Sequence, residues 1–484
     1  MKKIETIEPE MLSKIHGASL KILEETGVLF HHDEVLEIFK YHGATVQGKL
    51  VKLSPKLVEK CMEKVPARFT WKARNEIYTR TLGDGYLLQP AAGTVKVHDL
   101  DGRIREGTLE DYANFQKIYQ ACDIYDLVGM IPVEPKDVDT KFKHLYMMYE
   151  TLKHTDKPVN GFMTTGLQAR AQLDMMEIAV GGKKHFEHNH YMAVSIGVTT
   201  PLTYSWDPLE TMLHYVKRNQ VPTILCAPLA GVTSPFSMLG TAVLQNAEIL
   251  AGIVLVQLLR PGHPVVYCPS AVAANMQTCG FSTGAPESML INIANIQMGL
   301  DYYHIPVRAM SGFTDAKIPD FQAGAETMQN LMLGMLSGAH LLNESVGILD
   351  NILTVSYEKT ILDGEIISRI KRISQGISGV DRDLCVESIQ RVGHSGSYLT
   401  EPMTVKNCRN RWAPTTSFWG SQEDWEKTGA VDAAHRANQM ARQLLSDAPD
   451  SIIDPALDGE LLDYMEYECK NSRFMFDQGR YVNP

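Results

Sequence analysis

The stretch "SGFTDAKIPDFQAGAETM", residues 311–328, joins a short apolar run at 307–310 to a long pattern of apolar residues at helical spacing, 328–342. A simple strand-to-helix turn needs little more than a glycine and a helix cap. This connection instead carries an unusual density of aromatic, charged and amide side chains, namely Phe313, Asp315, Lys317, Asp320, Phe321 and Gln322. We therefore expect a ligand site at this connection.

The same unit, an apolar run followed by an amphipathic helix pattern, recurs along the chain. The runs expected to be strands are 86–100, 127–133, 158–163, 192–199, 222–229, 264–270, 306–310 and 346–355. Helix patterns lie between and after them, and several begin at a recognisable cap such as Thr108. Eight consecutive units predict an α/β fold of the (β/α)8 TIM barrel type. An open doubly wound sheet is the alternative.

The segments on either side of the repeats are expected to be extensions of the barrel. Residues 1–80 show three short helix patterns, one of them capped by Ser54. Residues 81–378 contain the strand–helix units. Residues 379–484 include a helix pattern near 432–447. We predict a helical N-terminal extension, a TIM barrel, and a C-terminal extension that packs on the barrel.

The composition is that of an ordinary globular protein with an acidic balance. Hydrophobic residues make up 44%, charged residues 21%, and the formal net charge is −11. Nucleic acids and anionic membranes attract basic faces, so neither is an expected partner. We see neither a signal peptide nor a membrane span. Eight scattered cysteines without a C-x-x-C pair are typical of reduced thiols, and a cytoplasmic location is expected.

The chemistry of a TIM barrel lies in the connections that follow its strands. The connections with candidate side chains are Gln89 with Gly93, 204–207, 226–231, 275–284, 311–328, and Asn343–Glu344, which is expected to lead into the last strand. They contain no G-x-S-x-G elbow, no H-E-x-x-H, no Walker loop, and no G-x-G-x-x-G after a strand. Acyl transfer, zincin chemistry and nucleotide binding therefore lack support.

Aromatic residues on these connections are candidates for a box around an ammonium ion: Phe313, Phe321, Tyr204, Trp206 and Phe281. Attraction of a cation to a ring face contributes about 0.5–2 kcal/mol. Packing of the same rings in the core is the alternative explanation. The carboxylates Asp315, Asp320 and Glu344 either serve a site or cap helices, and Asp320 fits a helix N-cap.

A zinc–thiolate site is a separate hypothesis, because Cys268 and Cys279 flank the exit of the sixth run and His263 precedes it. Such a site needs about three nitrogen or sulfur ligands held together. His263 is expected at the opposite end of the strand, so we expect structural cysteines and no metal.

Two stretches, 311–349 and 392–412, resemble the trimethylamine methyltransferase family (MttB superfamily), and the leader at 16–44 is similar to that family's amino-terminal helices. The resemblance runs over nearly the whole chain. It implies a TIM barrel that passes a methyl group from a methylated amine to the cobalt of a separate corrinoid protein, which docks over the barrel mouth.

The trimethylamine branch of the family carries pyrrolysine, and no such residue occurs in this sequence. A tertiary amine is a poor leaving group until something makes it cationic, whereas a quaternary ammonium already is cationic and leaves as a neutral amine. The resemblance therefore implies a non-pyrrolysine branch that acts on a quaternary amine of the betaine type, such as glycine betaine, proline betaine or carnitine. The cofactor it implies is cobalamin carried by the partner protein.

The resemblance also gives the candidate residues their roles. Expected contacts to the substrate come from Phe313, Phe321, Gln322, Tyr204, Trp206, Phe281, Arg308 and Lys317. Of these, Arg308 and Lys317 are candidates for binding a carboxylate. The candidate catalytic residues are Asn343, Glu344 and Asp315. The resemblance implies a His-Asp pair in many members of the family where this chain has Asn343–Glu344, so no histidine proton donor is expected here.

Two other functions stay open. The first is methyl transfer from methylcobalamin to a thiol or to tetrahydrofolate, for which zinc near Cys268 and Cys279 is expected. The second is a non-catalytic protein that binds betaines. A barrel of this size with exposed helices is also expected to form a homo-oligomer.

Overall fold

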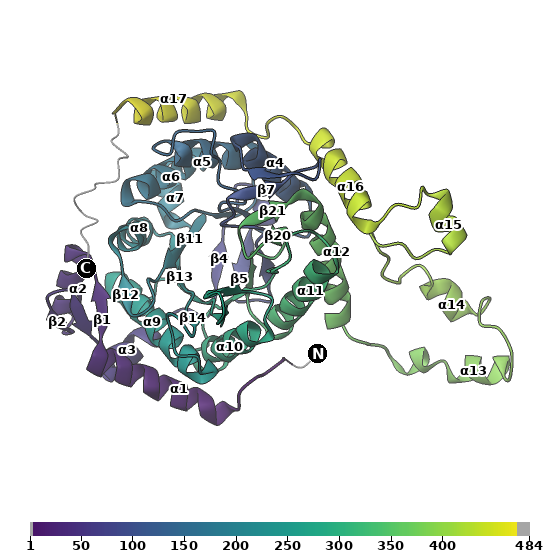
Figure 1. The fold of residues 1–484 in the computed structure, drawn as a ribbon, viewed down its shortest axis with the longest axis horizontal. Helices are drawn as coiled ribbons and strands as arrows, with labels where there is room; N and C mark the ends of the chain where they lie inside the picture. Colours follow the sequence, from purple (N-terminus) through teal and green to yellow (C-terminus); the bar gives the residue numbers. More distant parts are fainter. Residues whose placement is uncertain (1–2, 472–484) are drawn as a thin grey trace.

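Parallel strands form the centre of the molecule and helices surround them (Figure 1), in a computed structural model that describes residues 3–471. One parallel sheet has the order β15 (Val266–Pro269), β13 (Val221–Cys226), β11 (Met192–Gly197), β10 (Val159–Asn160) and β9 (Val128–Gly129). A second parallel sheet has the order β18 (Arg308–Met310), β19 (Leu341–Asn343) and β6 (Leu87–Leu88). The fold is therefore mixed α/β with parallel sheets.

The two sheets lie next to each other at both edges. On one side Tyr267 of β15 and Val307, which precedes β18, form an isolated parallel bridge. On the other side the amide nitrogen of Leu127, before β9, donates to the carbonyl oxygen of Leu88 in β6 at 3.2 Å. The carboxyl ends of strands from both sheets therefore point the same way.

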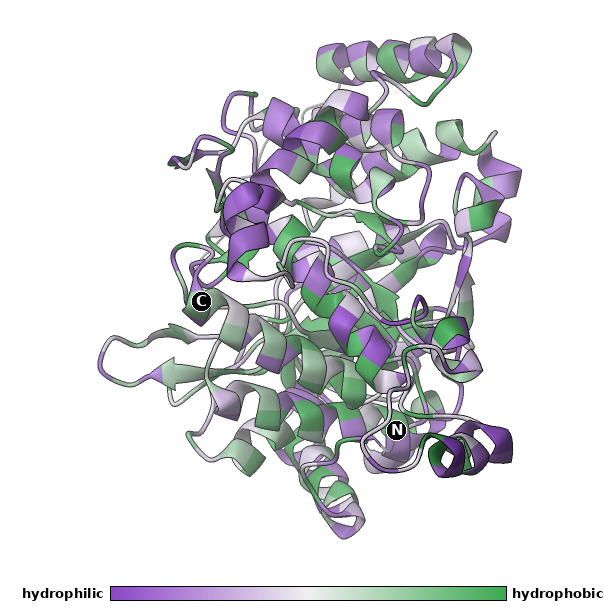
Figure 2. Ribbon diagram, turned by 90° about the vertical axis from the view of Figure 1, so that its right-hand side faces the viewer, coloured by the Kyte–Doolittle hydropathy of each residue, from purple (hydrophilic) through white to green (hydrophobic). Residues whose placement is uncertain are grey.

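Long helices connect the strands, as the sequence patterns predict. They are α4 (Leu109–Ala121), α5 (Lys143–His154), α6 (Gly166–Ala179), α8 (Trp206–Lys217), α9 (Met238–Leu259), α10 (Pro286–Gln297), α11 (Phe321–Leu336) and α12 (Tyr357–Ser374). The predicted caps at Thr108 and Asp320 are confirmed, because their side chains accept hydrogen bonds from the first turns of α4 and α11. Hydrophobic residues are concentrated in the interior of the molecule, and peripheral helices carry both kinds of residue (Figure 2).

The last strand differs from the prediction. We expected it at 346–355, with Asn343–Glu344 leading into it, but β19 ends at Asn343. Residues 346–355 instead contribute β20 (Ile348–Leu349) and the start of β21 (Thr354–Ser356), which form a small sheet with β7 (Lys96–His98) and β8 (Ile104–Glu106). The prediction was wrong because Leu341 and Leu342 continue the apolar pattern of α11, so the helix was expected to include them. In the structure the helical segment ends before these two leucines, at Gly338, whose φ is +88°. Asn343 and Glu344 therefore follow a strand.

The amino-terminal segment contains the predicted helices and short strands that the patterns did not reveal. Its helices are α1 (Pro9–Lys21), a π-helical turn (Ile22–Thr26), α2 (Asp33–Tyr41) and α3 (Pro55–Met62), with Ser54 as the predicted cap of α3. Its strands are β1 (Val28–Phe30), β2 (Thr45–Gln47), β3 (Leu50–Lys52), β4 (Phe69–Trp71) and β5 (Arg80–Leu82). Strand β1 pairs in parallel with β12 (Thr203–Tyr204), which ties this segment to the body.

One helix within residues 3–471, α9, is long and apolar enough to cross a membrane by length and composition. Of its most apolar window, 78% is buried inside the protein. It packs on α1, α3, α10 and strand β13. A buried core helix passes the same test, so α9 is weak evidence for a membrane span.

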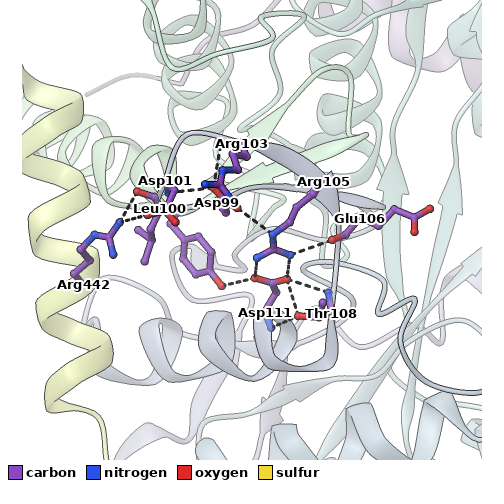
Figure 3. A network of polar contacts seen from close by, with 10 residues as sticks. Asp99, Leu100, Asp101, Arg103, Arg105, Glu106, Thr108, Asp111 and Arg442 are labelled. Atoms are coloured by element: carbon purple, nitrogen blue, oxygen red, sulfur yellow. Dashed lines mark hydrogen bonds and ion pairs between the residues drawn. The ribbon is translucent and has the colours of Figure 1, made fainter.

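The carboxyl-terminal segment returns to the body through α16 (Ala433–Asp447) and α17 (Pro455–Asn471), and α16 packs on α12 and α4. Figure 3 shows part of this contact. Arg105 of β8 donates to both oxygens of Asp111 in α4, at 2.6 and 2.9 Å. Arg442 of α16 donates to the carbonyl oxygen of Leu100 and to Asp101, at 2.6 and 2.8 Å. The tail is thus fixed to the β7–β8 hairpin.

Candidate functional site

The inner faces of the strands are apolar near their amino ends. One buried cluster joins these residues to the β4–β5 hairpin: Phe69, Trp71, Leu82, Leu87, Leu127, Ala193, Val221, Val266, Cys268 and Leu341. Because side chains alternate along a strand, a residue two positions further lies on the same face and nearer the carboxyl end. At these positions polar residues appear, namely Gln89, Ser195, Thr223 and Asn343. The interior therefore changes from apolar to polar towards the carboxyl ends of the strands.

Seven buried polar atoms in or beside this layer have no hydrogen-bond partner among the residues that the structure describes. They are Gln89 Nε2 and Oε1, Asn160 Oδ1, Ser270 Oγ, Arg308 Nε and Nη1, and Asn343 Oδ1. Leaving one such atom unpaired costs about 1–3 kcal/mol, and buried polar groups in native proteins are nearly always paired. The chemistry of this layer therefore fits a polar ligand, and we call these five residues together with Glu344 the polar chamber.

An ion pair lies at the edge of the polar chamber. Arg308 is 2% exposed and Glu344 is 4% exposed. Nη2 of Arg308 donates to both carboxylate oxygens of Glu344, each at 2.6 Å. The pairing of Arg308 with Leu341 places the guanidinium on the inner face of β18. Two donors of Arg308, Nε and Nη1, stay unpaired, so the ion pair keeps hydrogen-bonding capacity for a third group.

Three carboxamides form the other side of the chamber. Gln89 and Asn343 directly follow Leu88 and Leu342, which are paired in register, so the two side chains start from neighbouring positions. Nδ2 of Asn343 lies 3.6 Å from the sulfur of Met130. The amide of Met130 in turn donates to the carbonyl oxygen of Asn160. Three amide groups on β6, β10 and β19 are therefore gathered at one level.

The connection after β18 is held close to the chamber by backbone contacts. The amide and hydroxyl of Ser311 both donate to the carbonyl oxygen of Asn343, at 3.2 and 3.1 Å. A Cβ atom on Gly312 would lie 2.2 Å from the carbonyl oxygen of Glu344. Only glycine permits this approach, so Gly312 fixes where the connection passes Glu344.

The remaining predicted residues of this connection lie outside the chamber or turn away from it. Asp315 accepts a hydrogen bond from the amide of Gly284 at 3.2 Å, and burial raises the pKa of its carboxyl. Lys317 is exposed and binds Asp350 at 2.5 Å. Gln322 is exposed and donates to Glu326 at 2.9 Å. These contacts brace the connection itself.

The five predicted aromatic residues do not come together. Tyr204 is buried against α9, where its hydroxyl donates to the carbonyl oxygen of Glu248 at 2.8 Å and its ring stacks on Phe30. Trp206 stacks on His32. Phe281 and Phe321 are 50% and 89% exposed.

Phe313 is also buried, and of the five aromatic residues it is the one that lies beside Met310. Phe313 and Met310 both line a small cleft. Met310 pairs with Asn343, so Phe313 lies near the chamber.

The cysteines and the histidine of the zinc hypothesis are separated. Cys268 is buried in β15, and burial raises the pKa of its thiol to about 12. Cys279 is exposed in the turn between β16 (Val272–Asn275) and β17 (Gly280–Ser282). His263 precedes β15 and pairs with the carbonyl oxygen of Gln220 at 2.9 Å. Within residues 3–471 no group of three His, Cys, Asp or Glu residues is arranged to hold a metal ion.

Sequence analysis missed Asn160 and Ser270, and it noted Gln89 only as a strand-end residue. A polar residue that ends a buried run, such as the asparagine of "PVNG" at 158–161, is the signal that could have found them. The unpaired atoms themselves are visible only in three dimensions.

A buried polar chamber at the carboxyl ends of parallel strands is the usual position of the active site in an α/β enzyme. Residues 1–471 match the trimethylamine methyltransferase (MTTB) family. The chain therefore belongs to this family, as its sequence resemblance indicated.

Several relatives cover most of this chain. It is 33% identical to the glycine betaine methyltransferase of Desulfitobacterium hafniense (strain Y51), over 95% of this chain and 96% of the relative. It is 32% identical to the proline betaine:corrinoid methyltransferase of Eubacterium limosum, over 85% and 86%. It is 29% identical to the L-carnitine:corrinoid methyltransferase of Eubacterium limosum, over 80% and 82%.

Proposed function

We propose that this protein removes a methyl group from a quaternary amine of the betaine type and passes it to the cob(I)alamin of a corrinoid protein. The polar chamber carries the proposal, since it joins a carboxylate, a guanidinium and three carboxamides at the carboxyl ends of the strands. The relatives named for glycine betaine, proline betaine and carnitine support this substrate class. A non-pyrrolysine chemistry is part of the proposal, because a quaternary ammonium needs no activation before its methyl group leaves.

We further propose that the eight parallel strands close into a (β/α)8 TIM barrel. The contacts at Tyr267–Val307 and Leu127–Leu88 support closure at both edges of the two sheets. A closed barrel places the polar chamber on the axis at its carboxyl-terminal face. The face opposite is blocked by Phe69 and Trp71 in this arrangement.

The ammonium is bound by amide oxygens and the carboxylate, in this proposal, and not by a box of rings. The unpaired oxygens of Gln89, Asn160 and Asn343 carry partial negative charge, and the carboxylate of Glu344 lies beside them in its pair with Arg308. Such a set stabilises a cation in a site from which water is excluded. Of the predicted rings, Phe313 is the one retained in the proposed site.

The carboxylate of a betaine is bound by Arg308. Its Nε and Nη1 groups are buried and unpaired, and a charge-assisted hydrogen bond to a carboxylate satisfies them. Glu344 already neutralises the Nη2 side of the guanidinium. The chamber then holds a zwitterion of zero net charge beside an ion pair of zero net charge, which limits the cost of burial.

When bound, the corrinoid partner supplies a reduced cobalt nucleophile that takes the methyl group in a displacement reaction. The carbon–nitrogen bond breaks, and its electron pair stays on the amine, which leaves neutral. Gln89, Asn343 and Arg308 hold the substrate with one methyl group towards the opening, and the buried walls exclude water. Asp315 has an indirect role in this proposal, because it fixes the connection that passes Glu344.

Exposed apolar residues on the connections after the strands fit a docking face for the corrinoid protein: Met163, Phe236, Met276, Phe281 and Phe321. All belong to connections at the carboxyl ends of the strands. Exposed apolar residues that gather on one face are typical of an interaction surface. The predicted residues Phe281 and Phe321 are thereby reassigned from substrate binding to partner binding.

The proposal includes a cytoplasmic location, a homo-oligomer, and neither nucleic acid nor membrane as partner. All eight cysteines are free thiols, which supports a reducing compartment. The net charge of −11 disfavours binding to polyanions.

Mixing the protein with cob(I)alamin and each of glycine betaine, proline betaine, carnitine and trimethylamine tests the proposal. We expect the absorption spectrum of methylcobalamin with at least one quaternary amine, and none with trimethylamine. Absence of methylation with every quaternary amine, in the presence of a corrinoid protein that a relative can methylate, would contradict it.

A further inference from the structure

A segment of the carboxyl-terminal region, residues 377–415, has no buried residue at all. We call this segment the arm. It contains a 3-10 turn (Asp381–Leu384), α13 (Val386–Val392) and α14 (Pro402–Asn407). Figure 1 shows it extending away from the body between α12 and α16. Helices of six or seven residues are not stable alone in water, so a folded arm needs a surface to pack on.

The arm carries the side chains that such packing requires. Its exposed apolar residues include Ile377, Val380, Leu384, Val386, Ile389 and Leu399. Leu399 is 80% exposed and Ile377 is fully exposed. A run of exposed aliphatic residues in one segment is not expected on a surface that stays in water.

The same chain has a groove of matching character at the base of the arm. Its volume is about 620 Å³, and it lies between α11, α12 and the start of α16. Apolar and polar residues line it in equal numbers, and the apolar side chains include Ala323, Met328, Leu362, Ile366 and Ala433. The groove is large enough for several aliphatic side chains.

The net charges of the arm and the groove have opposite signs. The arm has five basic and four acidic residues, and three of the basic residues, Lys406, Arg409 and Arg411, lie together near its carboxyl-terminal end. In the groove, Lys359 pairs with Asp363 and Arg369 pairs with Glu365. The two other carboxylates that line the groove, Asp320 and Asp432, do not belong to these ion pairs. Each accepts a hydrogen bond from the backbone at a helix start, and both are exposed.

The arm is not placed to fill the groove of its own chain. Its carboxyl-terminal end is anchored at the groove wall, where the amides of Thr416 and Ser417 donate to Glu365 at 2.6 and 3.0 Å. Its other end leaves from the carboxyl-terminal end of α12, the same helix that carries Glu365. From these two anchors the arm runs outward (Figure 1).

We propose that the arm is an exchange arm that packs in the groove of a second copy of this chain. Two copies related by a twofold axis each supply one arm and one groove, so the contact is reciprocal and closes as a pair. The groove includes Asp320 and Ala323, at the start of α11 directly after the connection that passes Glu344. The second copy therefore contacts the helix that follows the candidate site.

The mass of the full-length protein in solution, measured by light scattering, tests this inference. One chain is 54.0 kDa, and the wild type is expected at twice that mass or an even multiple of it. A variant with Leu384→Glu, Ile389→Glu and Leu399→Glu in the arm is expected to have a particle mass in solution of half the wild-type value or less. The groove variant Ala433→Arg is expected to do the same. Ile77→Glu, at a residue that is 71% exposed on the body, is the control and should keep the wild-type mass.

Mixing the two variants separates this contact from others. The groove variant keeps an intact arm and the arm variant keeps an intact groove, so an equimolar mixture should regain mass that neither variant has alone. The inference is overturned if the wild-type protein is a monomer in solution. It is overturned in the same way if copies of the wild-type protein associate only when a corrinoid protein is present. It is also overturned by an arm variant with unchanged mass, or by a mixture that regains nothing although both variants show native circular dichroism.

Discussion

Arg308 and Glu344 form an ion pair that is almost completely buried, with one guanidinium nitrogen 2.6 Å from both carboxylate oxygens. Arg308 is the first residue of β18 and Glu344 directly follows the neighbouring strand β19, although 36 positions separate them in sequence. Removing charge from one partner leaves the other charge buried and unpaired, which is far more costly than losing an exposed pair.

Glu344→Gln is therefore expected to lower the free energy of unfolding by about 3–5 kcal/mol. The amide keeps the shape of the side chain but leaves the Arg308 charge without compensation. Urea denaturation measures the loss. Glu37→Gln, which breaks the exposed pair Lys40–Glu37, should leave the midpoint unchanged. An equal effect of both substitutions would contradict a buried ion pair.

Gln89→Leu is expected to raise the KM for the quaternary amine at least tenfold while the free energy of unfolding stays equal or increases. Gln89 is fully buried and neither amide atom is paired, so leucine removes a cost of burial. Gln245→Leu is the matched control. Gln245 is also fully buried, but it donates to the carbonyl oxygen of Cys226 at 2.8 Å. It should lose about 1–3 kcal/mol of stability and keep its KM.

Gly312→Ala is expected to destabilise the protein by about 1–3 kcal/mol and to lower kcat/KM. The new Cβ atom would meet the carbonyl oxygen of Glu344 at 2.2 Å, and backbone cannot move aside as a flexible side chain can. Gly17→Ala, in α1 with no atom within 4 Å of the new carbon, should instead stabilise the protein by up to about 1 kcal/mol. Thermal unfolding with activity assays compares the two.

The buried ring of His263 is expected to lower the free energy of unfolding in mild acid. Burial lowers the pKa of its ring from 6.5 to about 4 in the folded protein. Between these values the unfolded chain binds a proton that the folded protein does not bind, so stability is full above pH 6.5 and falls as the pH decreases to 4. The loss is roughly 3 kcal/mol. His263→Gln should flatten the pH dependence of the unfolding free energy in this window, and the exposed His42→Gln should not.

Tyr204→Phe distinguishes the two accounts of the aromatic residues. The hydroxyl of Tyr204 donates to the carbonyl oxygen of Glu248 on the outer side of the strands. Its removal should cost about 1 kcal/mol of stability and leave the KM for the amine unchanged. A tenfold increase in KM with unchanged stability would restore Tyr204 to the substrate site.

Much of the fold could be predicted because its signals are local. Caps at Ser54, Thr108 and Asp320 follow from hydrogen bonds within one helical turn, and the predicted helices begin there. The strand at 341–343 could not be separated from the preceding helix, because two leucines fit either period. Only the left-handed backbone at Gly338 separates the two.

The candidate site could be predicted in part. Arg308 was predicted as a candidate for binding a carboxylate, and Asn343 and Glu344 as residues that lead into the last strand. The structure places Asn343 and Glu344 at the end of a strand instead, and it pairs Glu344 with Arg308. The aromatic box could not be judged from sequence, since a tyrosine after a strand points inward or outward depending on the local register. Tyr204 points outward onto Gly252 of α9, where its hydroxyl would lie 2.3 Å from a Cβ atom.

The sequence by itself determined the strand–helix order, the family and the class of residues at the strand ends. These follow from periodicity, caps and the similarity of long stretches, all of which are properties of neighbouring residues. Only the tertiary structure decided that Gln89, Asn160, Arg308 and Asn343 share one buried layer with unpaired polar atoms. The physical reason is that strand register and burial depend on residues far apart in the chain, and they alone fix which side chains meet.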